Sequence, residues 1–272
     1  MNAEILAIGT ELLMGQIANT DAQFLSRQLN EIGINVYHHT VVGDNPGRME
    51  EALALALSRA DLVITTGGLG PTADDISKDI VAAHFGLSMV KDEASMRNLT
   101  NMFAHHAWSM TPNNERQAYF PEGAAILPNP NGTAPACIVE QDGKIVVVLP
   151  GPPNELQPIY LQSVRPYLIR KSNRRITSVM LRTMGLGEST VEDMLRNLID
   201  TQTNPTLATY VGDGDVLLRI TASTQEGEDP QGLLHPMVER VKDILGDAVY
   251  SQDGKDLPTV IVERLAAQGM TL

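Results

Sequence analysis

The sequence predicts an α/β protein in which a large domain with a mostly parallel sheet precedes a small α+β domain. Short apolar runs alternate with amphipathic stretches through the first half of the chain, as they do in parallel sheets with crossover helices. A glycine-rich loop, TTGGLGPTADD (65–75), directly follows one of these runs, where open α/β sheets place their ligands. From residue 175 onward the pattern changes to an antiparallel pair of strands between βα-type units.

Each element of the large domain has its own signal in the sequence. The apolar run EILAIG (4–9) predicts a strand. The next segment has apolar residues at helical spacing between a cap at Asn19 or Thr20 and a stop at Gly33. The same alternation then predicts a strand over 34–42, a helix over 47–60, a strand over 61–66 and a helix over 76–84 that stops at Gly86.

Residues 91–118 are expected to leave the sheet as a polar helical excursion that carries Trp108. The chain then returns to the sheet in strands over 124–127, 136–140 and 144–149. The stretch QDG (141–143) is a hairpin signal that joins the last two strands. In LPGPPNEL (149–156) a strand ends, and the prolines open a long helix that reaches about Ile169.

The small domain is placed at 171–252, after a large domain at 1–170. Its expected elements are strands over 178–185, 206–211, 216–222 and near Val249, and helices over 188–199 and 231–245. Residues 253–272 open like a helix on Pro258 and stop soon after a helix-terminating glycine, so we expect the chain to be cut before a further domain.

Composition narrows the class of ligand. The chain has 272 residues, of which 43% are hydrophobic, and a net charge of −13. This charge argues against a broad basic face for nucleic acid or anionic membrane, so a small ligand is expected. No apolar run approaches the ~20 residues that cross a bilayer, and the first residues lack a basic signal-peptide region, which predicts a cytoplasmic protein. The single cysteine, Cys137, is most simply a buried hydrophobe.

The glycine loop combines two features that a metal-bridged phosphate would explain. Its glycines let backbone N–H groups approach an anion, while the paired acids Asp74 and Asp75 repel an anion unless a cation lies between them. The loop matches neither the dinucleotide fingerprint nor the phosphate loop of nucleotide-binding proteins. A tight strand-to-helix turn that needs glycine only for its backbone angles is the alternative.

Three other turn-rich segments are candidate parts of the same pocket. GDN (43–45) places Asp44 beyond a strand end, although an aspartate there can simply cap a helix. NPNGTAPA (129–136) and LPGPPNE (149–155) also lie next to strands, and Glu155 begins a helix, but a proline-rich bend is equally natural. In GTELLMGQIANTD (9–21), the acids Glu11 and Asp21 flank a loop. Only together do these segments describe a pocket.

A series of segments across about 170 residues strongly resembles the CinA family; in chain order they are GTELLMGQIANTDAQFL, VVGDN, TTGGLGPTADD, MTPNNERQA, NPNGTAPA and LPGPPNE. The resemblance implies the three-layer α/β/α molybdopterin-binding fold of the MogA/MoeA group. In that fold the ligand pocket lies between the glycine loop and the PGxP turn. The two acids regarded as functional in this group map onto Asp44 and Asp75. Ala136 stands where relatives usually have glycine after GTAP, which could reshape that edge of the pocket.

The resemblance also implies activities. CinA-type proteins hydrolyse ADP-ribose to AMP and ribose 5-phosphate with a divalent metal, and their C-terminal amidase deamidates nicotinamide mononucleotide. That amidase opens with a helix like 258–269, so the chain as given is expected to lack it. A small K-homology-like domain lies between the two. Its nearest match to a GXXG loop is GLGE (185–188), and residues 171–272 carry 10 basic and 15 acidic side chains, so no nucleic-acid partner is expected.

We therefore expect a metal-dependent ADP-ribose pyrophosphatase of pyridine-nucleotide recycling, with Asp44 and Asp75 as catalytic residues. Mg²⁺ would be held by Asp44, Asp74 and Asp75, and Glu155 or Glu11 would orient the attacking water. The expected substrate-binding residues are Gly67, Gly68, Gly70, Thr72, Gly132, Thr133, Gly151, Pro153, Glu155, Glu11 and Asn19. A pterin-binding or adenylyl-transferring protein is one alternative. Another is a non-catalytic scaffold that dimerises and positions the amidase. We expect the chain to form a homodimer, with residues 91–118 as the candidate contact.

Overall fold

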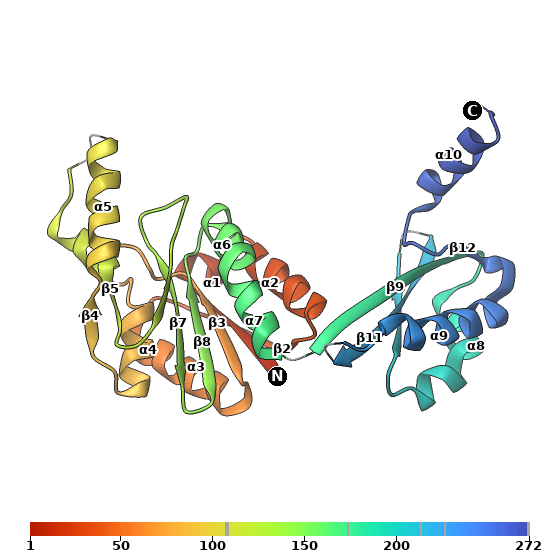
Figure 1. The fold of residues 1–272 in the computed structure, drawn as a ribbon, viewed down its shortest axis with the longest axis horizontal. Helices are drawn as coiled ribbons and strands as arrows, with labels where there is room; N and C mark the ends of the chain where they lie inside the picture. Colours follow the sequence, from red (N-terminus) through yellow and green to blue (C-terminus); the bar gives the residue numbers. More distant parts are fainter. Residues whose placement is uncertain (107–108, 173, 213, 226, 271–272) are drawn as a thin grey trace. The chain divides into compact units, whose positions relative to one another are not determined.

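The computed structural model describes residues 1–106, 109–172, 174–212, 214–225 and 227–270. The chain forms two compact units, 1–172 and 173–272, which are described separately (Figure 1). Trp108 lies outside the described residues. No helix of the described chain has both the length and the apolar character needed to cross a membrane.

The first unit is built on a six-stranded sheet of order β2-β1-β3-β8-β7-β6. Its strands are β1 (Asn2–Ile8), β2 (Asn35–Val42), β3 (Leu62–Thr66), β8 (Lys144–Leu149), β7 (Ala136–Gln141) and β6 (Ala125–Leu127). The first four are parallel, whereas β7 and β6 are antiparallel to their neighbours. The carboxyl ends of β1, β2, β3 and β8 therefore meet at one edge of the sheet.

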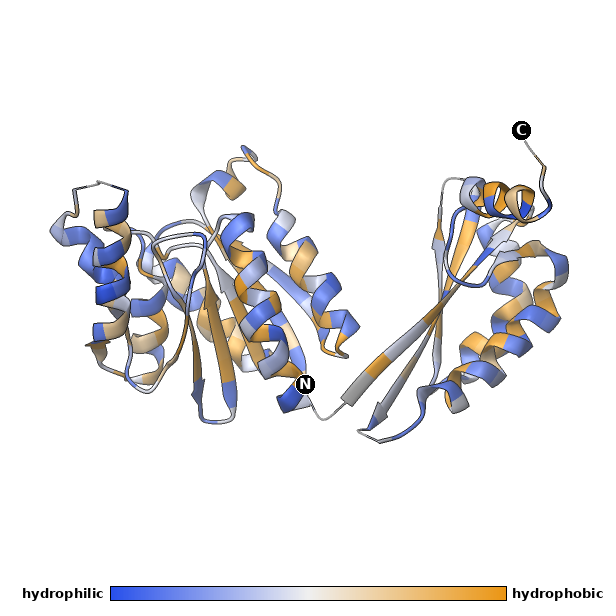
Figure 2. Cartoon of the chain, turned by 45° about the horizontal axis from the view of Figure 1, so that its top comes forward, coloured by the Kyte–Doolittle hydropathy of each residue, from blue (hydrophilic) through white to orange (hydrophobic). Residues whose placement is uncertain are grey.

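Helices cover both faces of this sheet and complete the predicted three layers. One face packs against α2 (Thr20–Glu31) and α6 (Pro153–Ile159), and the other against α3 (Pro46–Arg59) and α4 (Ser77–Phe85). Successive residues of one strand serve opposite layers, because Ile64 packs on the α2 side and Val63 on the α3 side. In Figure 2 the hydrophobic residues along the strands of this sheet are coloured orange.

Local signals determine where several elements end. The Asn19 side chain accepts a hydrogen bond of 3.0 Å from the Ala22 amide and caps α2, one of the two caps predicted. Gly86, with φ of 65°, ends α4 as expected. At the β7–β8 hairpin, Asp142 and Gly143 have φ of 52° and 74°, so the predicted tight turn is present.

The long helix expected to reach Ile169 forms with an irregular centre. After α6 a π-helical turn, η2 (Tyr160–Val164), leads into α7 (Arg165–Ser172). Pro158 and Pro166 have no amide hydrogen to donate, so regular α-helical hydrogen bonding is interrupted on both sides of this turn.

The excursion contains more than the predicted helix. It holds α5 (Glu93–His105) and the 3₁₀ helix η1 (Pro112–Ala118), as expected. A two-stranded antiparallel sheet, β4 (Met89–Lys91) with β5 (Tyr119–Pro121), closes its base and was not predicted. The short helix α1 (Thr10–Leu13) was not predicted either. Elements of three or four residues are too short to show a hydrophobic period.

The second unit is a four-stranded antiparallel sheet of order β10-β11-β9-β12 with two helices on one face. Its elements are β9 (Arg174–Met184), α8 (Glu188–Thr201), β10 (Thr206–Val211), β11 (Asp215–Gln225), α9 (Pro230–Leu245) and β12 (Val249–Ser251). The strands β9 and β11 are longer than predicted because they pair along their whole length. The helix α10 (Leu257–Ala267) follows and has no buried residue.

Candidate functional site

A cavity of about 410 Å³ lies beyond the carboxyl ends of β1, β3 and β8. It brings together most of the residues predicted for the site: Glu11, Asp44, Gly67, Gly68, Gly70, Thr72, Asp74, Asp75, Thr133, Gly151 and Glu155. Gly132 lines one neighbouring pocket, and Asn19 and Pro153 line another. We refer to the central space as the glycine-loop cavity.

The glycines of this loop are required by its backbone. Gly67 and Gly68 have φ of 95° and 67°, which L side chains rarely adopt. A Cβ at Gly67 would overlap the Ile8 carbonyl oxygen, and one at Gly68 would overlap the Ser77 hydroxyl. That hydroxyl donates to the Gly67 carbonyl at 2.7 Å and so fastens the loop to the start of α4. The predicted tight turn is therefore present, and it also forms the wall of the cavity.

The Gly67 amide is already occupied, which corrects part of the expected phosphate cradle. Its N–H donates to the Leu149 carbonyl at 3.0 Å. Within the described residues, the N–H groups of Gly68, Leu69 and Gly70 have no such partner. These three amides, rather than Gly67 to Gly70 together, are the ones that can meet an anion.

Asp44 and Asp75 are each anchored by a threonine through one carboxylate oxygen. Asp44 Oδ2 accepts from the Thr10 amide at 2.9 Å and from its hydroxyl at 2.7 Å. Asp75 Oδ2 accepts from the Thr72 amide and hydroxyl at the same two distances. The Oδ1 atom of each carboxylate has no hydrogen bond within the described residues. Each aspartate therefore has a fixed orientation and one oxygen that a ligand can use.

The alternative role of Asp44 as a helix cap is filled by its neighbour. The Asn45 side chain accepts a hydrogen bond of 3.1 Å from the Arg48 amide and caps α3. Asp44 itself reaches across to Thr10, after β1, and lines the glycine-loop cavity.

Asp74 differs from the other two acids because it is exposed. The Thr72 hydroxyl lies within hydrogen-bonding reach of Asp74 as well as of Asp75, and this hydrogen bond lowers the pKa of the Asp74 carboxyl. A single hydroxyl proton serves one carboxylate at a time. Thr72 thus couples the two acids at the mouth of the cavity.

Gln117 is a cavity residue that the sequence analysis did not single out. Its side chain is 2% exposed, and its Nε2 donates to the Thr133 hydroxyl at 3.1 Å. Its Oε1 is buried without a partner in the described chain. Gln117 lies within MTPNNERQA, a stretch that carries the resemblance, but nothing in its residue type or spacing identifies it as a lining residue.

The helix η1 supports the loop from behind. Arg116 donates to the Thr72 carbonyl at 3.1 Å. Lys78, on α4, donates to the Gln117 carbonyl at 3.0 Å and lies 4.2 Å from the centre of the Phe120 ring. Burial lowers the pKa of Lys78 to about 8. The lysine therefore ties α4 to the segment that carries Gln117.

Glu155 also lines the glycine-loop cavity. Its Oε2 accepts from Asn129 Nδ2 at 2.6 Å. Asn129 also donates to the Ala134 carbonyl at 2.9 Å, so the amide has little freedom to turn. A Cβ at Gly132 would overlap the Glu155 carboxylate. The segment 129–134 thus holds Glu155 in place.

The donor set fits a divalent cation held by two carboxylates. Across the described residues, no group of three or more His, Cys, Asp or Glu side chains is arranged to hold a metal. Mg²⁺ usually takes one or two protein carboxylates and fills its other positions with water and substrate phosphates. The free oxygens of Asp44 and Asp75 match that need, whereas Asp74 faces solvent.

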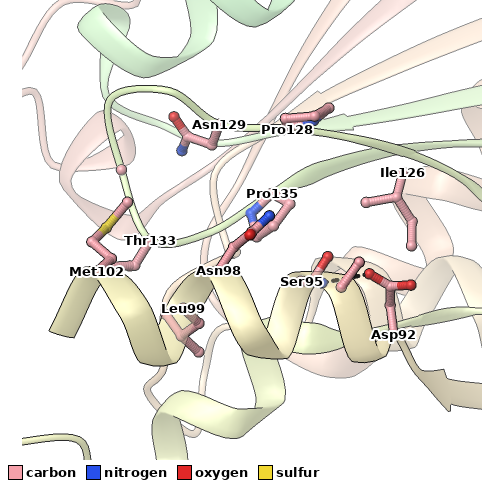
Figure 3. A pocket seen from close by; sticks show the side chains of 12 residues that line it. Asp92, Ser95, Asn98, Leu99, Met102, Ile126, Pro128, Asn129, Thr133 and Pro135 are labelled. Atoms are coloured by element: carbon pink, nitrogen blue, oxygen red, sulfur yellow. Dashed lines mark hydrogen bonds between the residues drawn. The ribbon is translucent and has the colours of Figure 1, made fainter. Parts of the chain in front are cut away.

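A second pocket, of about 320 Å³, adjoins this cavity at Thr133. Side chains of α5 face the segment 126–135 across it (Figure 3). Its walls combine apolar side chains, among them Leu99, Met102 and Pro135, with the polar side chains of Asp92, Ser95, Asn98, Asn129 and Thr133. Apolar walls with a few convergent polar groups are typical of pockets that bind small organic ligands.

Comparison with known proteins agrees with this division of the chain. Residues 4–170 match the family model described as "Probable molybdopterin binding domain", and residues 178–251 match "Damage-inducible protein CinA KH domain". Two relatives, from Thermoanaerobacter pseudethanolicus and Acetivibrio thermocellus, are 47% and 48% identical over all of this chain. Both are named competence-damage inducible proteins, and the chain spans 66% of their length.

One solved structure is similar to the first unit. It is described as the protein CinA with unknown function from Thermoplasma acidophilum, and it is 32% identical with a TM-score of 0.57. The match covers 61% of this chain and 98% of that one.

Proposed function

The chain belongs to the CinA family, with a molybdopterin-binding-type domain followed by a CinA KH domain, and on this basis we propose that its glycine-loop cavity hydrolyses ADP-ribose to AMP and ribose 5-phosphate. The observation that carries the proposal is the pair Asp44 and Asp75. Each is fixed by a threonine through one oxygen, and both line a cavity walled by free backbone amides. The proposal includes a cytoplasmic location, in pyridine-nucleotide recycling.

In this mechanism Asp44 and Asp75 would hold a divalent cation, which when bound would neutralise charge at the diphosphate and lower the pKa of an attacking water. The N–H groups of Gly68 to Gly70 donate to the phosphoryl oxygens as charge develops there. Glu155, oriented by Asn129, accepts a proton from the attacking water while the oxygen of that water forms a bond to one phosphorus. The bond between that phosphorus and the bridging oxygen breaks, and the other phosphate leaves with the bridging oxygen.

The test is incubation of the chain with ADP-ribose and Mg²⁺, with AMP followed by chromatography and EDTA as a control. Asp75→Asn should reduce turnover by about 10³-fold or more, because it removes one of two charges that hold the cation. Asp142→Asn is the matched control. Asp142 is exposed in the β7–β8 turn, where asparagine adopts the same backbone angles.

Turnover near the wild-type level in Asp75→Asn would remove Asp75 from the mechanism. Metal-dependent AMP that is lost in this variant, but kept in Asp142→Asn, would support the proposal. Activity that is insensitive to EDTA would contradict the role of the cation.

The match of residues 4–170 to a molybdopterin-binding model favours pterin binding as a second candidate. It would use the same cavity, with the ring in the pocket of Figure 3. Quenching of pterin fluorescence by a chain that does not turn over ADP-ribose would favour it.

A wild-type chain that forms no AMP from ADP-ribose, with cavity variants that behave in the same way, would favour a non-catalytic scaffold. An amidase activity remains a proposal for a domain that would follow residue 272.

A further inference from the structure

Lys78 carries a buried charge that the proposed mechanism does not use. It is the second residue of α4 and is 5% exposed. Its Nζ donates to the Gln117 carbonyl at 3.0 Å and to the Arg116 carbonyl at 3.3 Å, and it lies 4.2 Å from the centre of the Phe120 ring. A lysine buried to this degree is rare, because removing its charge from water costs free energy. Its contacts therefore point to a role beyond packing.

The two carbonyls belong to residues that hold the glycine loop. Arg116 donates to the Thr72 carbonyl at 3.1 Å, and Gln117 Nε2 donates to the Leu69 carbonyl at 3.4 Å. Leu69 and Thr72 lie on the two sides of Gly70, whose N–H has no backbone partner within the described residues. A shift of η1 would therefore move the amides that can meet an anion.

The same segment supports a candidate metal ligand. The Thr72 amide and hydroxyl donate to Asp75 Oδ2 at 2.9 and 2.7 Å. At the start of the loop, the Ser77 hydroxyl donates to the Gly67 carbonyl at 2.7 Å. Ser77 and Lys78 are successive residues at the start of α4. This helix end therefore holds the loop directly through the serine and holds η1 through the lysine.

The charged and titratable groups around Lys78 compensate its charge only weakly. They are Cys137 on β7, Asp79 on α4 and Arg116 on η1. Burial raises the pKa of the Cys137 thiol to about 12, so the thiol is neutral near pH 8. Asp79 attracts the lysine, but its side chain is 46% exposed and pairs with Arg116 at 3.4 Å. Burial accordingly lowers the pKa of Lys78 to about 8, and the ammonium loses its charge in mildly alkaline solution.

We propose that Lys78 is a positioning residue for the reaction in the glycine-loop cavity, where its ammonium fixes η1 behind the loop, and that loss of its proton slows the reaction while the fold remains. This inference rests on the proposed function. Lys78 is not among the residues that line the cavity, so it acts through η1 rather than on the substrate. A neutral amine donates weaker hydrogen bonds to the two carbonyls and loses its attraction to the Phe120 ring.

Loss of this proton should change activity and stability in opposite directions. Unfolding returns Lys78 to its ordinary pKa of 10.5. Between about pH 8 and this value the unfolded chain binds more protons than the folded chain, so the contribution of Lys78 to the free energy of unfolding rises with pH. Activity should fall as the pH enters the same range. A residue with a purely structural role would lower activity only by lowering stability.

The test measures kcat for ADP-ribose with Mg²⁺, and the free energy of unfolding in urea, from about pH 6.5 to about pH 9.5. Wild-type kcat should fall about tenfold with an apparent pKa near 8, a change that corresponds to about one hydrogen bond to a charged group. KM should change by less than about twofold, because the loop amides act mainly on charge that develops in the transition state. Lys78→Arg keeps its charge throughout, so the alkaline fall should disappear.

Lys78→Met fills the space without a charge. Its kcat at pH 7 should be about tenfold below that of wild type, with no further fall near pH 8, and its free energy of unfolding should be no lower than that of wild type. Lys144→Met is the matched control. Lys144 also donates to a backbone carbonyl, that of Ala60 at 2.9 Å, but it does not line the cavity. The control should keep the wild-type pH profile.

An alkaline fall that persists in Lys78→Met would overturn the inference, and so would a loss of kcat in this variant that accompanies a loss of stability. If Lys78→Met does not fold, an alkaline fall in Lys78→Arg equal to that of wild type decides against the inference in the same way. AMP formation by wild type without a fall near pH 8 would overturn this inference alone. Formation of no AMP at any pH would refute the proposed function and this inference with it.

Discussion

Each of the two candidate metal ligands is held by short contacts to one threonine. Asp44 is held by Thr10, which follows β1, whereas Asp75 is held by Thr72 within its own loop. The Thr10 amide and hydroxyl both occupy one oxygen of Asp44, and the Thr72 amide occupies one oxygen of Asp75 while the Thr72 hydroxyl is shared with Asp74, so neither carboxylate plane rotates freely. Such fixed donors are what a catalytic cation requires if its position is to be set before substrate arrives. The threonines are therefore positioning residues.

Asp21, on α2, is a buried carboxylate whose Oδ1 atom has no hydrogen bond within the described residues. Burial raises its pKa to about 6 from an ordinary value of 3.8. Between these values the folded chain binds more protons than the unfolded chain, so its free energy of unfolding falls as the pH rises through this range. Above about pH 6 the full destabilisation is present.

We therefore expect Asp21→Asn to raise the free energy of unfolding at pH 7.5 by up to about 3 kcal/mol, since the pKa shift is about two units. The gain should be about 1 kcal/mol smaller at pH 5, where part of the wild-type carboxyl is protonated in the fold. Urea unfolding of both proteins at the two pH values measures this. A variant less stable than wild type at pH 7.5 would show that the carboxylate has a partner in the fold.

At the scale of elements, a buried ion pair joins β1 to its neighbours. Glu4, on β1, is fully buried and accepts two hydrogen bonds of 2.8 Å from Arg59 at the end of α3. Its Oε1 also accepts from the Thr40 hydroxyl on β2 at 2.6 Å. The amino-terminal half of β1 is therefore fixed to both elements.

Arg59→Met should lower the free energy of unfolding by about 3 kcal/mol, because it leaves the Glu4 carboxylate buried without a counter-charge. This loss of unfolding free energy is at the lower end of the usual range for a broken buried ion pair, since the Arg59 side chain is 34% exposed. The double variant Glu4→Met/Arg59→Met should recover at least half of the loss, because no charge then stays buried. Denaturant unfolding of the three proteins tests this. A double variant no more stable than Arg59→Met would contradict the argument.

Elements with a long period or a specific end signal could be predicted from the sequence; of the short elements, β6 and β12 were predicted but α1, β4 and β5 were not. The caps of α2 and α4 and the β7–β8 turn depend on residues next to each other, so the sequence reveals them. The strands β4 and β5 have three residues each and exist because they pair across the excursion. The π-helical turn after α6 lies between Pro158 and Pro166, whose missing amide hydrogens a hydrophobic period does not record.

The same distinction holds for the candidate site. The loops could be placed at one sheet edge, because parallel strands bring their carboxyl ends together. The contacts that shape the site could not be foreseen. Thr10 meets Asp44 across 34 residues, and Gln117 reaches the cavity from a 3₁₀ helix. Long-range contacts of single side chains depend on packing, which has no local signature.

At the scale of the whole molecule, the charge of this chain predicts that its CinA KH domain does not bind nucleic acid. The net charge is −13, and residues 171–272 carry 10 basic and 15 acidic side chains. The GLGE loop connects β9 to α8, with Gly185 at a φ of 82°. The helix that follows begins with Glu188 and continues with Glu192 and Asp193. A nucleic-acid backbone at this loop would therefore meet three carboxylates within two helical turns.

We expect no binding of a single-stranded 20-mer, DNA or RNA, tighter than a Kd of about 10⁻⁴ M at physiological salt, which is the weak end of non-specific binding. Fluorescence anisotropy of labelled oligonucleotides measures this. A triple variant, Glu188→Lys/Glu192→Lys/Asp193→Lys, changes the local charge by six units and should bring salt-dependent binding into range if the loop geometry is competent. Salt-dependent binding by the wild-type chain, abolished by Gly187→Asp, would mean that the loop recognises nucleic acid in spite of its charge. The acidic residues of α8 would then have to face away from the bound strand.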